Sequence, residues 1–221
     1  SDLVTDGSAG GTSMLKDIAS KTTVPGFGNC IIDNYTPIGS ANGTAFFQAW
    51  DSTGMCLWKS DGTTAGTVKL QQLSKIYDDV WREFTDVNGK LFFRAKTDAA
   101  GTELWVSDGT PAGTKMVKDI KPGTASAYPS SFCNVNGTLF FVANDGTNGD
   151  ELWKSDGTEA GTVMLEITPG SGGTSVGSLI SMGGKVYFSG GDQSVNGQEL
   201  WVSDGTVAGT KEVKDINPGM Y

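Results

Sequence analysis

Residues 103–120 read ELWVSDGTPAGTKMVKDI, and three near-copies of this phrase occur elsewhere in the chain. They begin at Cys56, Glu151 and Glu199, and a degenerate copy, LVTDGSAGGTSMLKDI, begins at Leu3. The aspartates of the four complete copies are 47 or 48 residues apart. A fixed period of this length is typical of repeat architectures such as solenoids and propellers. We therefore expect a single repeat domain in which the recurring residues build each unit.

Each unit predicts four short antiparallel strands. An Asn-Gly pair, or Gly183-Gly184 in the last unit, stands between two strand-like runs, as a type I′ hairpin turn requires. The next strand is the ELW segment, and the S-D-G-T-x-x-G-T turn then leads into a fourth strand. Asp in such a turn accepts hydrogen bonds from nearby backbone N–H groups. The predicted structural aspartates of this turn are Asp61, Asp108, Asp156 and Asp204.

Apolar residues on both faces of these strands indicate sheets that are covered on both sides by similar neighbours. This is the requirement of a propeller blade. We predict an all-β β-propeller of four-stranded antiparallel blades, with four complete blades plus an N-terminal half blade, and we favour five-bladed geometry. The predicted boundaries are a half blade 1–18, an irregular linker 19–41, and blades 42–73, 74–120, 121–168 and 169–221. The half blade leaves three readings open: a fragment of a longer ring, an incomplete five-bladed ring, or a ring completed by another chain.

Composition limits the function classes. The formal net charge is −9 and no Lys/Arg block is present, which disfavours nucleic acid as a partner. No run of 18 apolar residues occurs, so we expect no membrane span. The chain contains no His, which removes the commonest general base and zinc ligand. Three cysteines are present, of which Cys30 and Cys56 could pair or could be small buried side chains.

The repeated phrase resembles the bacterial ELWxxDGT-repeat family over nearly the whole chain, from Leu3 to Gly219. The resemblance implies a propeller-type repeat fold and a secreted or cell-surface location, and it implies no particular activity. The SDGT turn is also similar to the Asp-box of sialidase-like propellers, although here the Ser and the Asp are adjacent. That box is a structural turn, so the resemblance transfers no catalytic residue.

Some aromatic residues lie outside the repeat pattern and are candidates for ligand binding. An exposed aromatic ring can stack on the C–H face of a sugar, whereas a buried one only packs locally. The candidates are Trp50, Trp81, Tyr35, Tyr77 and Tyr128.

Oxygen-bearing loops follow the aromatic strands. The densest set, Asp145, Asn148 and Asp150, offers the type of ligand that calcium prefers. A plain polar turn explains the same residues, so we expect no cofactor, with calcium as the one candidate.

Our first functional prediction is a non-enzymatic extracellular module for adhesion or carbohydrate binding, with a glycan or a surface protein as its partner. The first alternative is a structural spacer or self-assembly module, completed by other copies through open blade edges or by missing sequence. The second alternative is a glycoside hydrolase-like enzyme. The acidic cluster that would serve such an enzyme is Asp78, Asp79, Glu83 and Asp86.

Overall fold

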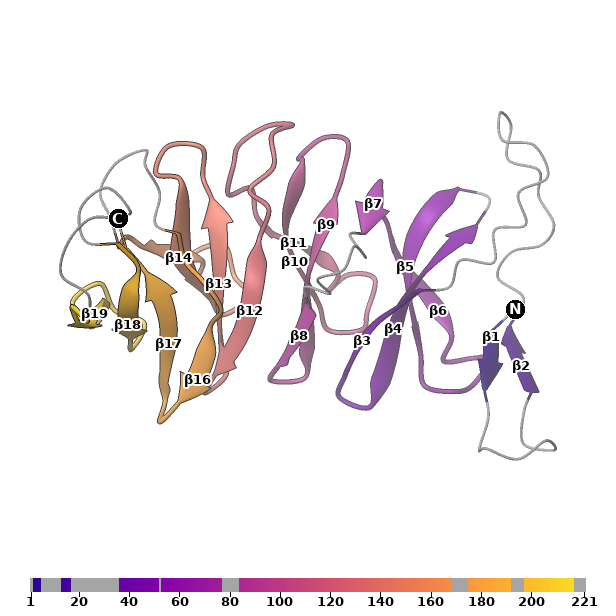
Figure 1. Ribbon diagram of the computed structural model, residues 1–221. Coiled ribbons are helices and arrows are strands. Elements are labelled where there is room, and N and C mark those ends of the chain that lie inside the picture. The colour runs from indigo at the N-terminus through magenta and orange to yellow at the C-terminus, as the bar shows by residue number, and fades with distance from the viewer. Residues whose placement is uncertain are drawn as a thin grey trace.

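The computed structural model describes residues 2–4, 13–16, 36–51, 53–76, 84–167, 175–191 and 197–216. Within these ranges every helix or strand assigned is a β-strand, and the strands pair antiparallel. Four sheets of four or five strands follow one another along the chain, and Figure 1 shows them as a row of blades. The chain therefore has the all-β, propeller-like fold that the repeat predicts.

Three of the four blades are four-stranded sheets whose strands are adjacent in chain order. Blade one contains β3 (Thr36–Ala41), β4 (Thr44–Asp51), β5 (Gly54–Ser60) and β6 (Val68–Gln72). Blade three contains β12 (Ser130–Val135), β13 (Thr138–Asn144), β14 (Asp150–Ser155) and β15 (Val163–Leu165). Blade four contains β16 (Ile180–Met182), β17 (Lys185–Gly190), β18 (Glu199–Ser203) and β19 (Lys211–Lys214).

Blade two has five strands because its first strand is divided. Both β7 (Lys75–Ile76) and β8 (Phe84–Val87) pair with β9 (Lys90–Lys96), β7 at one end of it and β8 at the other. The remaining strands are β10 (Thr102–Ser107) and β11 (Lys115–Lys118). The non-repeated sequence of this blade is thus placed within its first strand.

The predicted hairpin turns form at the expected positions. Asn136 and Gly137 have φ values of 50° and 83°, and both central residues of a type I′ turn need positive φ. Asn42-Gly43, Asn88-Gly89 and Gly183-Gly184 behave in the same way. Each turn joins the first two strands of its blade and fixes their register.

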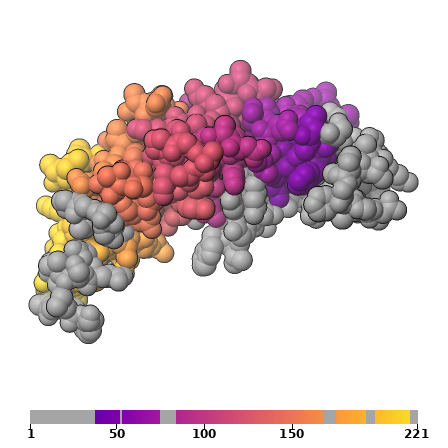
Figure 2. Space-filling view, turned by 90° about the horizontal axis from the view of Figure 1, so that it is seen from above, coloured from indigo at the N-terminus to yellow at the C-terminus, as the bar shows by residue number. Residues whose placement is uncertain are grey.

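The hydrophobic core lies mainly between blades. The largest clusters of buried side chains each combine residues of two successive blades. Seen from above, the blades follow one another along a curved row (Figure 2). A blade is therefore stabilised by its neighbours as well as by its own hydrogen bonds.

One predicted boundary is wrong. Residues 19–41 were expected to be an irregular linker, whereas β3 begins at Thr36 and pairs with β4 as the first strand of blade one. The hairpin at Asn42-Gly43 requires this strand on its N-terminal side. In the range predicted as a half blade, β1 (Asp2–Val4) pairs with β2 (Ser13–Lys16). The number of blades in a complete ring stays a prediction.

Candidate functional site

The repeated aspartate holds the turn that joins the third and fourth strands of a blade. Asp108 Oδ1 accepts hydrogen bonds from Thr110 N at 2.8 Å and Thr110 Oγ1 at 2.7 Å. Thr110 Oγ1 in turn accepts from Gly113 N at 2.9 Å. The hydrogen bond from the Thr110 hydroxyl lowers the pKa of Asp108. The same pair of bonds to the threonine two residues later is made by Asp61, Asp156 and Asp204.

The glycine of the same turn lies close to the preceding blade. A Cβ added to Gly157 would lie 3.1 Å from Phe92 Cζ of blade two, and one added to Gly205 would lie 3.2 Å from Phe140 Cζ of blade three. Gly62, in blade one, has the same φ of 89° as Gly157, but a Cβ added there would meet no described residue within 4 Å. The turn is thus part of the blade-to-blade contact from blade two onward.

We call the face that a blade turns to the next blade its forward face, and the opposite face its backward face. Forward residues of the first three blades are buried in the same clusters as backward residues of the following blade. The forward sets are Ala41, Phe46, Leu57 and Leu70; Val87, Phe92, Leu104 and Val117; Val135, Phe140, Leu152 and Leu165. The backward sets that they meet are Leu91, Phe93 and Trp105; Leu139, Phe141 and Trp153; Val186, Phe188 and Trp201.

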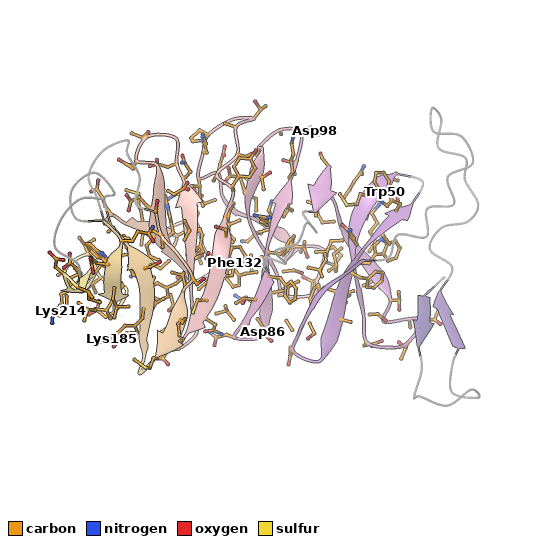
Figure 3. The ribbon with its side chains drawn as sticks, viewed as in Figure 1. Trp50, Asp86, Asp98, Phe132, Lys185 and Lys214 are labelled. Carbon is orange, nitrogen blue, oxygen red and sulfur yellow. The ribbon has the colours of Figure 1, made fainter. Side chains whose placement is uncertain are left out.

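Blade four presents an exposed forward face. Met182 is 60 % exposed, Leu200 40 % and Val213 49 %. At the equivalent positions of blade three, Val135, Leu152 and Leu165 are no more than 4 % exposed. Figure 3 shows Lys185 of β17 and Lys214 of β19 at this end of the stack, in the blade that carries these apolar residues.

The glutamate of the ELW segment is buried, and its role was not foreseen. Glu103 is fully buried, and its carboxylate accepts from Ile120 N at 3.0 Å, Ala127 N at 3.2 Å and Lys121 N at 3.4 Å. Burial raises the pKa of Glu103 to about 7, against the opposing effect of these backbone donors. Glu151 accepts from Ile167 N, and Glu199 from Ile216 N, both at 2.9 Å. The sequence contained a signal for this role, because a glutamate that recurs in an otherwise apolar strand indicates a buried acid with hydrogen-bond partners.

Blade one replaces this glutamate with Cys56, which lies next to a polar cluster. Lys69 Nζ donates to Asp51 Oδ2 at 2.9 Å and to Thr53 Oγ1 at 2.7 Å. Thr53 Oγ1 donates to Asp51 Oδ1 at 2.6 Å and lies 3.8 Å from the sulfur of Cys56. Gln72 Nε2 donates to the backbone oxygen of Thr53 and closes the loop. We call Asp51, Thr53, Cys56 and Lys69 the polar cluster.

The charges of the polar cluster support one another. Burial alone would raise the pKa of Asp51, but hydrogen bonds from Thr53 and Lys69 outweigh it, so the pKa is lowered. Burial alone would lower the pKa of Lys69, but the hydrogen bond to Asp51 and the other contacts of the polar cluster outweigh it, so the pKa is raised. Burial raises the pKa of the Cys56 thiol. Cys56 is a free thiol, and its candidate partner Cys30 lies outside the described residues.

The predicted ligand-binding aromatics fall into two groups. Trp50, 39 % exposed, lies near the end of β4 in blade one, and Figure 3 shows it far from Lys185 and Lys214. Tyr128, 60 % exposed, lies between β11 and β12, and its N–H donates to Thr102 O of blade two. The two therefore belong to different blades. Tyr35, Tyr77 and Trp81 lie outside the described residues.

The predicted metal ligands use their oxygens within the loop. Asp145 Oδ1 accepts from Thr147 N and Asn148 N, and its Oδ2 accepts from the Asn148 side chain, all at 2.8 Å. Asp150 Oδ1 accepts from Asn144 Nδ2 at 3.0 Å. Among the described residues no group of three or more His, Cys, Asp or Glu is arranged to hold a metal ion. Both carboxylate oxygens of Asp145 and one of Asp150 are thus used in hydrogen bonds within the loop.

The predicted acidic cluster of a hydrolase lies almost wholly outside the described residues. Asp78, Asp79 and Glu83 lie outside the described residues. Asp86 is described, and its carboxylate accepts from Gly89 N at 2.8 Å and Asn42 N at 3.3 Å. These bonds place Asp86 at the hairpin turns of blades one and two. The described residues also contain no helix that could cross a membrane.

The sequence matches no family model, and no curated protein matches it. A puromycin hydrolase structure matches with a TM-score of 0.49 and 15 % identity over 84 % of this chain and 29 % of that chain. An endo-1,4-beta-xylanase from Bacteroides thetaiotaomicron matches with a TM-score of 0.32 and 16 % identity, over 83 % and 75 %. An alpha-L-arabinofuranosidase from Clostridium thermocellum matches with a TM-score of 0.33 and 15 % identity, over 77 % and 68 %. The chain spans less than a third of the length of the puromycin hydrolases.

These comparisons correct two expectations. We predicted a non-enzymatic module for adhesion or carbohydrate binding, whereas the three solved structures named above are hydrolases. We therefore withdraw the adhesion prediction and the prediction that the chain is not an enzyme. The physical reason is that one blade architecture hosts many activities, so a repeat fold without His does not exclude catalysis. At these identities the likeness concerns the fold, and no activity is transferred from it.

Proposed function

We propose that the chain is a structural stacking module, in which each blade is the packing partner of the next and the stack is continued by a further blade. The observation that supports this most directly is the recurrence of one forward set and one backward set at three successive contacts. With a recurring contact of this kind, the stability of the chain is approximately the sum of the stability of each blade and of the contact between each pair of neighbouring blades. The repeated sequence is then the part of the chain that performs the function.

The energetic argument rests on the forward leucines. Leu57, Leu104 and Leu152 are fully buried between blades. Full burial of a leucine stabilises by about 2 kcal/mol relative to exposure, so the four forward residues at each contact together stabilise the pair of blades by several kcal/mol. The apolar residues of blade four are retained although they are exposed. A terminal repeat that ends a stack carries a polar outer face instead, and this supports continuation.

We also propose the finer architecture that the repeat implies. The stack is a section of a propeller with five-bladed geometry, and the chain belongs with the ELWxxDGT-repeat proteins at a secreted or cell-surface location. The period of 47 or 48 residues and the intact phrase in four units support this proposal.

The test compares two leucines at the same position of the repeated phrase. Leu152→Ala removes a fully buried side chain and should lower the free energy of unfolding by about 3 kcal/mol. Leu200→Ala removes one that is 40 % exposed and should cost about 1 kcal/mol or less. Both are measured by urea denaturation of the full chain at low protein concentration. Equal losses for the two variants would show that contact with the next blade is not what stabilises a blade.

Hydrolysis at the polar cluster is the second candidate function. A hydroxyl bonded to both an amine and a carboxylate is the arrangement that activates a nucleophile, and Thr53 has it. Two features rank this candidate second: the pKa of Asp51 is lowered, which weakens it as a base, and Lys69 is held in its charged form. Turnover of p-nitrophenyl acetate that persists in Thr124→Val and disappears in Thr53→Val would favour hydrolysis. Equal rates in both variants and the parent would reject it.

A further inference from the structure

The forward face of blade four is a row of exposed apolar residues that the blade contacts leave unexplained. Met182, Leu200 and Val213 are exposed there, and Lys185, Lys211 and Lys214 lie on the same blade. Isolated exposed apolar residues need no explanation, but a row that is buried in three equivalent copies does. The three internal contacts show what covers such a row.

We infer that this face binds a four-stranded blade of the same repeat type, which presents a Leu-x-Phe strand and a tryptophan on its backward face. The inference rests on the proposed stacking function and names the partner of its open end. At the described contacts this is the chemistry that meets the forward residues: Leu139, Phe141 and Trp153 cover blade two, and Val186, Phe188 and Trp201 cover blade three.

Charge complementarity favours the same partner. The charge of Lys90 in blade two contributes to lowering the pKa of Asp108 in its own blade and of Asp156 in the next. Lys185 is the residue that begins the equivalent strand of blade four, and its charge acts on Asp204 of its own blade. The turn aspartate of a following blade would reproduce the arrangement between blades two and three, the one described contact with a lysine at this position. A partner with a basic backward edge would be repelled.

The hairpin turns of successive blades also contact one another. A Cβ added to Gly137 would lie 2.6 Å from the Asn88 side chain, and one added to Gly184 would lie 2.9 Å from that of Asn136. The positive φ of Gly137 and Gly184 requires glycine at these positions, and the asparagine of the preceding blade packs closely against each of them. Blade four has Gly183 where the others have Asn, so it offers no such side chain to its partner. It also lacks the bond that Asn88 Nδ2 donates to Gly137 O at 3.0 Å.

Oxidation of Met182 reports directly on coverage of this face. Methionine oxidation follows exposure, and Met182 is 60 % exposed, whereas Met55 is 5 % exposed and serves as an internal reference. The probe is the full chain extended after Tyr221 by a copy of residues 126–167, which keeps the repeat spacing. The control carries Leu139→Lys and Phe141→Lys in the added copy only. Peroxide oxidation of Met182 is followed by mass spectrometry of peptides.

The expected result is that the added blade slows Met182 oxidation about tenfold and that the control extension does not. Unchanged oxidation in the extended chain would overturn the inference. Equal protection of Met182 by the control extension would also overturn it, because the Leu-x-Phe strand would then not be what covers the face. Either failure leaves the packing among blades one to four intact if Leu152→Ala and Leu200→Ala still differ, so the two proposals fail separately.

Discussion

The buried glutamate of the ELW segment connects a blade to the chain that leads to the next blade. Glu103 in β10 accepts backbone N–H groups of residues 17 to 24 positions later, beyond the end of the same blade. A buried acid without partners would cost several kcal/mol, and these donors supply the missing hydrogen bonds. The side chain therefore fixes the exit of the blade rather than any chemistry.

Glu103 predicts a specific dependence of stability on pH. Its pKa is about 7 in the folded chain and 4.5 as the ordinary value, so the folded state binds the proton more tightly. The free energy of unfolding should fall as pH rises from about 4.5 to 7, by on the order of 3 kcal/mol, and change little from this group above that window. Glu103→Gln should flatten the curve. The measurement is urea denaturation between pH 4.5 and 8.

The exposed Glu159→Gln provides the matched control, because it removes one carboxylate without a buried partner. It should leave the pH dependence as in the parent chain. Parallel curves for Glu103→Gln and the parent would mean that Glu103 titrates in the folded state as it does in the unfolded state.

Residues with local partners were predictable from the sequence, and residues with distant partners were not. Asp108 binds Thr110 two positions later, so the turn chemistry is contained in the phrase itself. Glu103 and the polar cluster bind groups that are far along the chain, as Lys69 binds Asp51 from 18 positions away. Such pairs form only once the sheet has brought the strands together.

At the scale of elements, the hairpins and strands follow from local sequence. Asn-Gly pairs fix the first turn of blades one to three, and the aromatic strands carry consecutive buried residues, as expected of a sheet covered on both faces. The divided first strand of blade two was not predicted. Lys75–Ile76 is too short to be recognised by its pattern, and only its pairing with β9 assigns it.

The face of each strand that meets the next blade was also beyond the sequence. The repeat predicted that both faces would be covered, but Leu152 and Trp153 are adjacent, and both are apolar. Only the clusters assign Leu152 to the forward face and Trp153 to the backward face. Leu200 of blade four occupies the same position as Leu152, and it is exposed because no described blade covers that face.

At the scale of the whole molecule, the fold and the function separate. Repeat length, strand count and turn chemistry predicted the propeller-like architecture, because each is a property of one unit. The adhesion prediction depended on residues outside the repeat, and Tyr35, Tyr77 and Trp81 among them lie outside the described residues. Composition excluded little, because a fold of this type carries unrelated activities.

Coupling between blades is the central claim, and hydrogen exchange of two glycine variants tests it. Gly157→Ala and Gly62→Ala impose the same backbone strain at φ 89°, but only Gly157→Ala places a Cβ against Phe92 of the preceding blade. We expect Gly157→Ala to cost about 1 to 2 kcal/mol more. Exchange measured by mass spectrometry should rise in the strands of both blade two and blade three for Gly157→Ala, and in blade one alone for Gly62→Ala. Faster exchange confined to blade three in Gly157→Ala would contradict the account.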